Sequence, residues 1–174
     1  LVITIVGTTF LIASGISSAT TVLISQAFGR KNMLELNKQF KTGFQLALLT
    51  MSCMAIILIF FGKYIAMIFS NDPEVIELAS GFFIVAGIFQ IIDGSQVSLL
   101  GALRGINDVA KPMKYALISY VFVAIPFAYV CGFVLNLGSW SIFAGFLAGL
   151  LTAAILYYNR FRKVVRKHVL SMSK

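Results

Sequence analysis

The sequence predicts an all-α integral membrane protein with five transmembrane helices. Of the 174 residues, 59% are hydrophobic and only 11% are charged, whereas soluble domains carry about 25% charged residues. The mean hydropathy is correspondingly high, at +0.94. The apolar residues also form runs of roughly 20 or more, the length that a helix needs to cross a bilayer. These three observations together indicate the fold class.

Five such runs follow one another along the chain. The first covers about 2–28, and the second about 42–61, which could continue past Lys63 to Phe69. The third covers about 74–103. The uncharged stretch that follows is too long for one helix. Turn-forming residues at 136–139 divide it into a fourth span of about 114–135 and a fifth of about 139–159.

Local residues support several of these boundaries. The segment 72–74 (Asp-Pro-Glu) predicts a helix N-cap, a first-turn proline and an acidic first turn. Gly29 follows the first run, where a helix C-terminus favours glycine. Pro112 is expected near the start of the fourth helix, and Pro126 is expected to kink it.

The cations alternate between the two sides of this predicted topology. Segments 29–41 and 104–114 and the tail after residue 159 hold thirteen of the fourteen Lys and Arg residues, and Lys63 is the exception. By the positive-inside rule, the cation-rich side faces the cytoplasm. We therefore expect Leu1 outside and Lys174 in the cytosol, in a multi-pass membrane protein.

Several classes of protein are excluded. The net charge of +8 does not indicate nucleic-acid binding, because the cations form no single patch interleaved with aromatic residues. No His/Cys metal spacing, nucleophile–base pair or Gly-rich phosphate loop indicates an enzyme. Cys53 and Cys131 lie in apolar spans and are interpreted as small buried hydrophobes. The uncharged opening run lacks an initiator Met and a basic leader, so we expect a piece of a longer protein.

Glu74 and Glu77 stand near the start of the third predicted span and Lys114 at the start of the fourth, so Asp93 is the only Lys, Arg, Asp or Glu in the interior of the five spans. A carboxylate at the bilayer centre costs about 2.5–3.5 kcal/mol, so such residues are usually functional. Gln90 and Gln96 stand three residues before and after Asp93, which places them beside it on one helix face. Asp93 is therefore a candidate coupling site that binds Na⁺ or exchanges a proton. The alternative is a structural hydrogen bond between helices.

Small and hydroxyl side chains follow helical spacing in two of the spans. In the first span they form one stripe: Ser14, Ser17, Ser18, Thr21 and Ser25. This stripe could line a water-filled cavity or allow close helix packing. In the fifth span the residues Ser141, Gly145 and Gly149 predict a packing ridge. The basic tail after residue 159 is interpreted as an anchor near anionic lipid.

Two longer segments resemble a known family. Residues 89–108, Phe-Gln-Ile-Ile-Asp-Gly-Ser-Gln-Val-Ser-Leu-Leu-Gly-Ala-Leu-Arg-Gly-Ile-Asn-Asp, followed by a proline, resemble the tenth-helix motif of the MATE (multidrug and toxin extrusion) family, most closely its NorM-like bacterial branch. Residues 19–30 resemble the end of the eighth helix and the loop after it. The resemblance covers 1–174 as helices eight to twelve, part of the C-terminal lobe of a twelve-helix antiporter. The structural motif positions are Gly29, Gly101, Arg104, Gly105, Asp108 and Pro112.

The resemblance implies a function and a site. In NorM-like relatives, the aspartate that matches Asp93 helps to bind the coupling cation, Na⁺ or H⁺, and no other cofactor is implied. Phe89 stands where relatives often have tyrosine, so it lacks that hydroxyl. The other acidic partner is expected from the seventh helix, which is missing here together with the N-terminal lobe. The implied activity is export of small organic cations, drugs or toxins, by alternating access across the cytoplasmic membrane of a bacterium, within membrane lipid.

Two other functions are alternatives to the antiporter, and the end of the third predicted helix has an expected structural role. A flippase for lipid-linked oligosaccharides, from the same superfamily, would be expected to carry several cations inside its spans. A channel or scaffold subunit would be expected to show a repeated polar ring. Arg104 lies eleven residues after Asp93, about 16 Å along a helix. Arg104 and Gly105 together are expected to close the helix end and dock the loop to Pro112.

Overall fold

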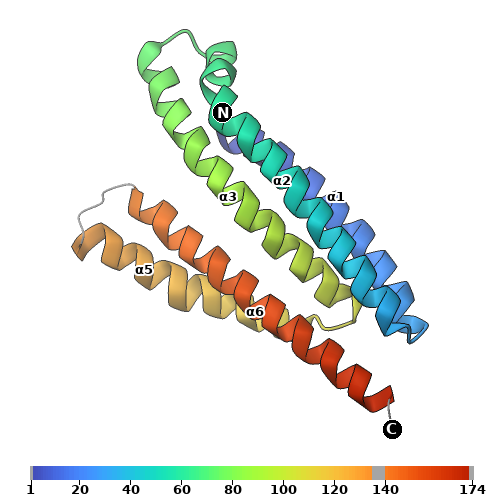
Figure 1. Ribbon diagram of the computed structural model, residues 1–174. Helices are drawn as coiled ribbons and strands as arrows, with labels where there is room; N and C mark the ends of the chain where they lie inside the picture. Colours follow the sequence, from blue (N-terminus) through green and yellow to red (C-terminus); the bar gives the residue numbers. More distant parts are fainter. Residues whose placement is uncertain (1, 135–139, 173–174) are drawn as a thin grey trace.

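The computed structural model describes residues 2–134 and 140–172, and these ranges contain helices and short turns but no strand. Figure 1 shows α1 (Val2–Gly29), α2 (Met33–Phe69) and α3 (Pro73–Gly105) in sequence. A fourth continuous helix consists of α4 (Ala110–Leu117), η1 (Ile118–Ala124), α5 (Ile125–Tyr129) and η2 (Val130–Val134). The last helix is α6 (Trp140–Met172). Five of these helical stretches are long and apolar enough to cross a membrane, which confirms the predicted fold class.

Two helices are longer than the sequence predicted. α2 begins at Met33 rather than at about 42, while its end at Phe69 agrees with the longer of the two predicted ends. α6 continues to Met172 rather than ending at about 159. Segment 29–41, which was predicted to connect two spans, is therefore largely helical, and Lys38 belongs to α2. An apolar run in the sequence ends at the first charged residue. The helix itself continues, because lysine and arginine are good helix formers. The expected turn at 136–139 lies outside the described residues.

The helices form two groups that share α3. α1, α2 and α3 contact one another, and α6 contacts α3 on one side and the fourth helix on the other. In Figure 1 the two groups stand apart where α3 begins and approach each other where α3 ends. The labelled N- and C-termini lie at opposite ends of the molecule, as an odd number of spans requires.

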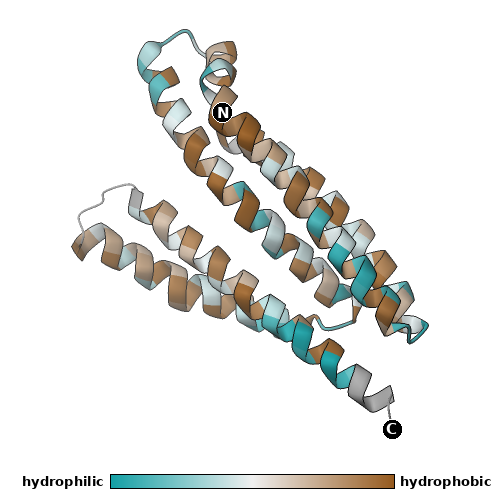
Figure 2. Cartoon of the chain, in the orientation of Figure 1, coloured by the Kyte–Doolittle hydropathy of each residue, from teal (hydrophilic) through white to brown (hydrophobic). Residues whose placement is uncertain are grey.

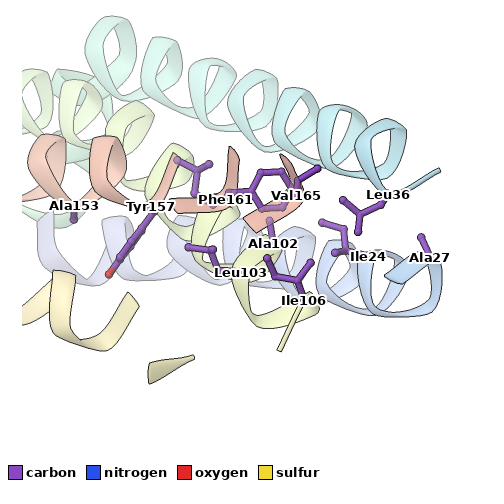
Figure 3. Close-up of a cluster of buried hydrophobic side chains, with 11 residues drawn as sticks. Ile24, Ala27, Leu36, Ala102, Leu103, Ile106, Ala153, Tyr157, Phe161 and Val165 are labelled. Carbon is purple, nitrogen blue, oxygen red and sulfur yellow. The ribbon is translucent and has the colours of Figure 1, made fainter. Parts of the chain in front are cut away.

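The largest hydrophobic core joins the two groups at the end where they approach. Figure 3 shows its buried side chains, which come from the end of α1, the start of α2, the end of α3 and the part of α6 from Ala153 to Val165. Leu36, Leu103 and Tyr157 are each at most 1% exposed. The Phe161 ring of α6 lies 4.2 Å from the Phe40 ring of α2. A smaller cluster around Leu58 and Phe83 joins α2 to α3 nearer their other ends.

Main-chain hydrogen bonds end both α1 and α3 in the same way. At α1 the residue in the left-handed region is Lys31 (φ 56°), and the N–H of Asn32 donates to the Ala27 carbonyl at 3.0 Å. At the end of α3 the residue in the left-handed region is Asn107 (φ 59°), and the N–H of Asp108 donates to the Leu103 carbonyl at 3.0 Å. These are Schellman motifs. The expectation for Gly29 was thus right about the helix end and wrong about which residue turns the backbone.

The glycine and the arginine at the end of α3 contribute in different ways. A Cβ atom on Gly105 would lie 2.8 Å from Cγ2 of Ile24, so this glycine permits close contact between α1 and α3. The Arg104 side chain is exposed, and it is the Arg104 carbonyl that accepts a hydrogen bond from the Asn107 N–H at 2.9 Å. Arg104 therefore takes part in closing the helix through its backbone carbonyl. Pro112 is buried in the first turn of α4.

Two other local predictions agree with the structure. Asp72 caps α3 by accepting a hydrogen bond from the Glu74 N–H at 3.0 Å, and a proline occupies the first turn. On α6, Gly149 faces the fourth helix, where a Cβ atom would lie 2.8 Å from the Ala124 Cβ. Gly145 meets Ala128 in the same way, so the small residues form a packing ridge. Pro126 lies in α5, between the π-helical segments η1 and η2.

Candidate functional site

Asp93 lies within α3, about two-thirds of the way along it, and its side chain is half-buried. Within residues 2–134 and 140–172, its carboxylate makes no hydrogen bond and no ion pair. The described helices therefore supply no partner for a structural hydrogen bond between helices. An apolar span that carries such a carboxylate incurs a desolvation cost without compensation from these residues.

The two flanking glutamines are buried, and each binds a different helix. Gln90 is 4% exposed, and its Nε2 donates to Thr9 Oγ1 of α1. Gln96 is 7% exposed, and its Nε2 donates to the Tyr120 hydroxyl of η1 at 3.0 Å. The Tyr120 hydroxyl lies 3.2 Å from Gln96 Oε1, to which it donates. The three residues share one arc of α3 as predicted, but the glutamines do not converge on Asp93.

These glutamines instead fix the rotation of α3. One holds it against α1 and the other against the fourth helix, so the side chain between them, Asp93, is directed between those two neighbours. Sequence reasoning missed Thr9 and Tyr120. A threonine and a tyrosine in distant apolar spans carry no signal of this role, because only the packing of the helices brings them to α3.

Phe89, one turn before Asp93, belongs to a group of aromatic rings between α3 and α6. Its ring centroid lies 6.1 Å from that of Phe143 and 5.7 Å from that of Phe146. The Tyr120 ring lies 5.8 Å from Phe146 and extends the group to η1. An apolar cavity of about 190 Å³ adjoins these rings, lined by Val85, Ile88, Phe89, Phe143, Ala144 and Leu147. Phe89 therefore offers an apolar surface here and no oxygen ligand.

The hydroxyl stripe of α1 divides between two environments. Ser17 Oγ donates to the Val97 carbonyl at 2.8 Å, and Thr21 Oγ1 donates to the Gly101 carbonyl at 2.9 Å, so both pack α1 against α3. Ser14 is half-buried, whereas Ser18 is exposed. Within this chain the buried part of the stripe favours helix packing over a water-filled cavity, because its hydroxyls are already used between helices.

The end of the tenth-helix motif forms an ion pair. Arg160 Nε of α6 donates to Asp108 Oδ2, just after α3, at 2.6 Å. Asp108 is therefore a link between helices and takes no part in a cation site with Asp93. Among the described residues, no three His, Cys, Asp or Glu side chains gather to hold a metal ion. A sodium ion at Asp93 would need further oxygen ligands, as hard cations do.

Comparison with known proteins shows which family and which relatives the chain resembles. The MatE family model matches residues 1–130. The "Probable multidrug resistance protein NorM" of Xylella fastidiosa (strain 9a5c) is 36% identical over 155 residues, which are 89% of this chain and 33% of that protein. The "Multidrug resistance protein NorM" of Aliivibrio fischeri is 33% identical over 151 residues, 84% of this chain and 33% of that protein. The chain thus spans about a third of the length of these relatives.

Solved structures show the same fold. The eukaryotic MATE transporter AtDTX14 aligns with a TM-score of 0.83 at 17% identity, covering 96% of this chain and 38% of that one. An inward-facing multidrug resistance MATE family transporter of the MOP superfamily aligns with a TM-score of 0.84 at 16% identity, covering 96% and 39%. The arrangement of the five spans in Figure 1 is therefore one that membrane transporters adopt.

The family match and the structure agree on the nature of the protein. The bacterial relatives and the five apolar helices identify a multi-pass bacterial membrane protein. They also confirm the prediction that the chain is not an enzyme, since members of this family are transporters. Because a family model matches most of its length, the chain belongs to the MatE family.

Proposed function

We propose that residues 1–174 form most of the C-terminal lobe of a cation-coupled multidrug efflux transporter. The family match and the names of the NorM relatives support multidrug efflux. The chain would correspond to helices eight to twelve of a twelve-helix protein. The seventh helix and the N-terminal lobe would then complete the transport cavity.

The observation that carries this proposal is the position of Asp93. Its carboxylate is half-buried in an apolar span and has no polar partner among the residues that the structure describes. Gln90 and Gln96 hold α3 on both sides of it, which fixes the direction of the Asp93 side chain. A carboxylate that is held in place but unpaired is suited to bind Na⁺ or a proton reversibly.

The coupling follows from differential binding. Inward-moving Na⁺ or H⁺ would bind at Asp93 more tightly in one access state than in the other, and only this difference can drive the change of state. The two lobes would rock around a site near the membrane midplane and release a small organic cation outside. The seventh helix would supply further oxygen ligands for a bound Na⁺.

The proposed orientation rests on the distribution of charge. Hydrophilic residues gather at the helix ends, and along α6 they begin before its C-terminal end (Figure 2). The cation-rich end is the one where α1 and α3 end and α2 begins. By the positive-inside rule this end and the C-terminus would lie in the cytoplasm.

The test is the substitution Asp93→Asn in the full-length protein. Asparagine is nearly isosteric and keeps hydrogen-bonding capacity, but it can neither carry a proton for coupling nor offer a full negative charge to Na⁺. We expect loss of gradient-driven efflux of a fluorescent organic cation from cells, at unchanged abundance in the membrane. Imposing a Na⁺ gradient or a proton gradient separately identifies the coupling ion.

Asp72→Asn is the matched control. Asp72 is an exposed N-cap, and asparagine caps a helix as well as aspartate does, so efflux should be unchanged. Efflux by the Asp93→Asn protein at a native rate, still dependent on the ion gradient, would show that Asp93 is not the coupling site.

A further inference from the structure

The C-terminal half of α6 has one strongly basic face. Arg162, Lys163, Arg166 and Lys167 are all exposed. Their spacing of i, i+1, i+4 and i+5 places them on the same side of the helix. We call these four residues the basic face. It lies beyond the apolar part of α6, where hydropathy alone would have ended the helix.

The opposite face of the same segment is packed into the main core. Phe161 and Val165 are 2% and 9% exposed and belong to the core cluster that joins α6 to the other helices (Figure 3). The Phe28 ring at the end of α1 lies 5.0 Å from the His168 ring. Because these contacts fix the rotation of the segment, the basic face points away from the other described helices in a defined direction.

The position of the basic face along α6 matches the lipid headgroups. α6 begins at Trp140, and Tyr158 lies about 27 Å further along it at ~1.5 Å per residue. That length is close to the hydrocarbon thickness of about 30 Å. Tyr158 is 43% exposed, and the Arg162 guanidinium lies 5.8 Å from its ring centroid. Aromatic residues mark the membrane–water interface, so the basic face begins where the headgroups begin.

The described chain offers no counter-ion to these cations. Two carboxylates lie at this end of the molecule. Glu35 Oε2 accepts a hydrogen bond from Asn32 Nδ2 at 3.2 Å, and Asp108 pairs with Arg160 at 2.6 Å. Within residues 2–134 and 140–172, the pair between Asp108 and Arg160 is the one salt bridge. The described residues therefore leave these four charges unneutralised, so the basic face can attract anions around the protein.

We propose that the basic face of α6 is a binding surface for anionic phospholipid headgroups. The four cations stand at headgroup level, face outwards and are held there by the buried side of the same helix. Each Lys or Arg near an anionic membrane surface adds attraction, and the attraction weakens with salt. The proposal concerns lipid attachment and does not depend on which ion drives transport.

The test measures which lipid the full-length protein retains. The protein is purified from vesicles that contain equal amounts of phosphatidylglycerol and phosphatidylcholine, and the retained lipids are quantified by mass spectrometry. We expect the native protein to retain an excess of phosphatidylglycerol. Replacing all four cations (Arg162→Gln, Lys163→Gln, Arg166→Gln, Lys167→Gln) should bring the retained ratio close to that of the vesicles.

A charge-preserving variant is the matched control. Arg162→Lys, Lys163→Arg, Arg166→Lys and Lys167→Arg change the same four positions but keep the charge, so the excess of phosphatidylglycerol should remain. Salt should reduce the excess for the native protein. If the fourfold variant fails to fold, two double variants replace it: Arg162→Gln with Lys163→Gln, and Arg166→Gln with Lys167→Gln. Each should lose part of the excess of phosphatidylglycerol.

Two outcomes would overturn the proposal. One is that the neutralised variants keep the native excess of phosphatidylglycerol, or that the native protein has none. The other is that inorganic phosphate displaces the lipid far better than chloride at the same ionic strength, which would indicate a site for free phosphate. Equal displacement by the two anions supports attachment to the lipid surface.

Discussion

Asp108 and Arg160 are joined by a hydrogen-bonded ion pair, with 2.6 Å between Asp108 Oδ2 and Arg160 Nε. Their side chains are only 15% and 16% exposed, respectively. The pair connects the turn after α3 to α6, next to the core cluster that joins the two helix groups. It is thus a polar counterpart to the apolar contact between these groups.

Removing one member of this pair should destabilise the protein. Asp108→Asn would leave the Arg160 guanidinium largely buried without a carboxylate, at a cost of about 1–3 kcal/mol, between the values for exposed and buried pairs. The measurement is the apparent Tm of the full-length protein in detergent. Lys111→Gln is the control, because Lys111 is exposed and makes no ion pair among the described residues. Equal Tm values for the two variants would contradict a stabilising pair.

Close contact between α1 and α3 should make Gly101 intolerant of a side chain. A Cβ atom there would overlap Ser17 Oγ and lie 3.0 Å from Thr21 Oγ1. Gly101→Ala should therefore cost about 1–3 kcal/mol as an overpacked contact. The fraction of full-length protein that remains monodisperse after heating is the measurement.

Gly15→Ala provides the comparison for Gly101→Ala. Gly15 is in the same helix pair, but a Cβ atom added there would meet nothing within 4 Å. Alanine should there be neutral or stabilise by up to about 1 kcal/mol, because it favours helix more than glycine does. A similar loss of stability for both variants would contradict a specific clash with α1 at Gly101, because helix propensity alone favours alanine at both positions.

The left-handed residues at the two helix ends should respond differently to glycine. Lys31→Gly should raise stability by about 1 kcal/mol, because a residue with a Cβ is strained at a positive φ and glycine is not. Asn107→Gly should gain less, since asparagine tolerates this region. Chemical unfolding of the two variants beside the native protein measures the difference. A loss of stability in Lys31→Gly would show that its side chain has another role.

The proposed sidedness predicts a labelling pattern. In a variant without Cys53 and Cys131, a cysteine at Asn71 should react with a membrane-impermeant thiol reagent in intact cells. A cysteine at Lys111 should react only after permeabilisation. Both positions are exposed, and neither takes part in the cap of α3 or the ion pair of Asp108. Equal reaction at both positions in intact cells would reverse or abolish this topology.

The sequence by itself determined the fold class, the five spans and the N-cap at Asp72. These features depend on residues that are close together in the chain, because transfer of an apolar run into lipid and local hydrogen bonds need no distant partner. The candidate residue Asp93 was found for the same reason. A single carboxylate in an apolar run is conspicuous whatever surrounds it, although its role in coupling stays a prediction.

The partners of the site and the true helix ends were decided only by the tertiary structure. Gln90 and Gln96 were expected beside Asp93, yet one binds Thr9 and the other binds Tyr120, because the neighbouring helices present those hydroxyls. Hydropathy describes how favourably each residue transfers from water into an apolar solvent. It contains no information about which helix lies next to that residue. The helices also continue through their terminal charges, since backbone hydrogen bonding does not stop where the apolar run does.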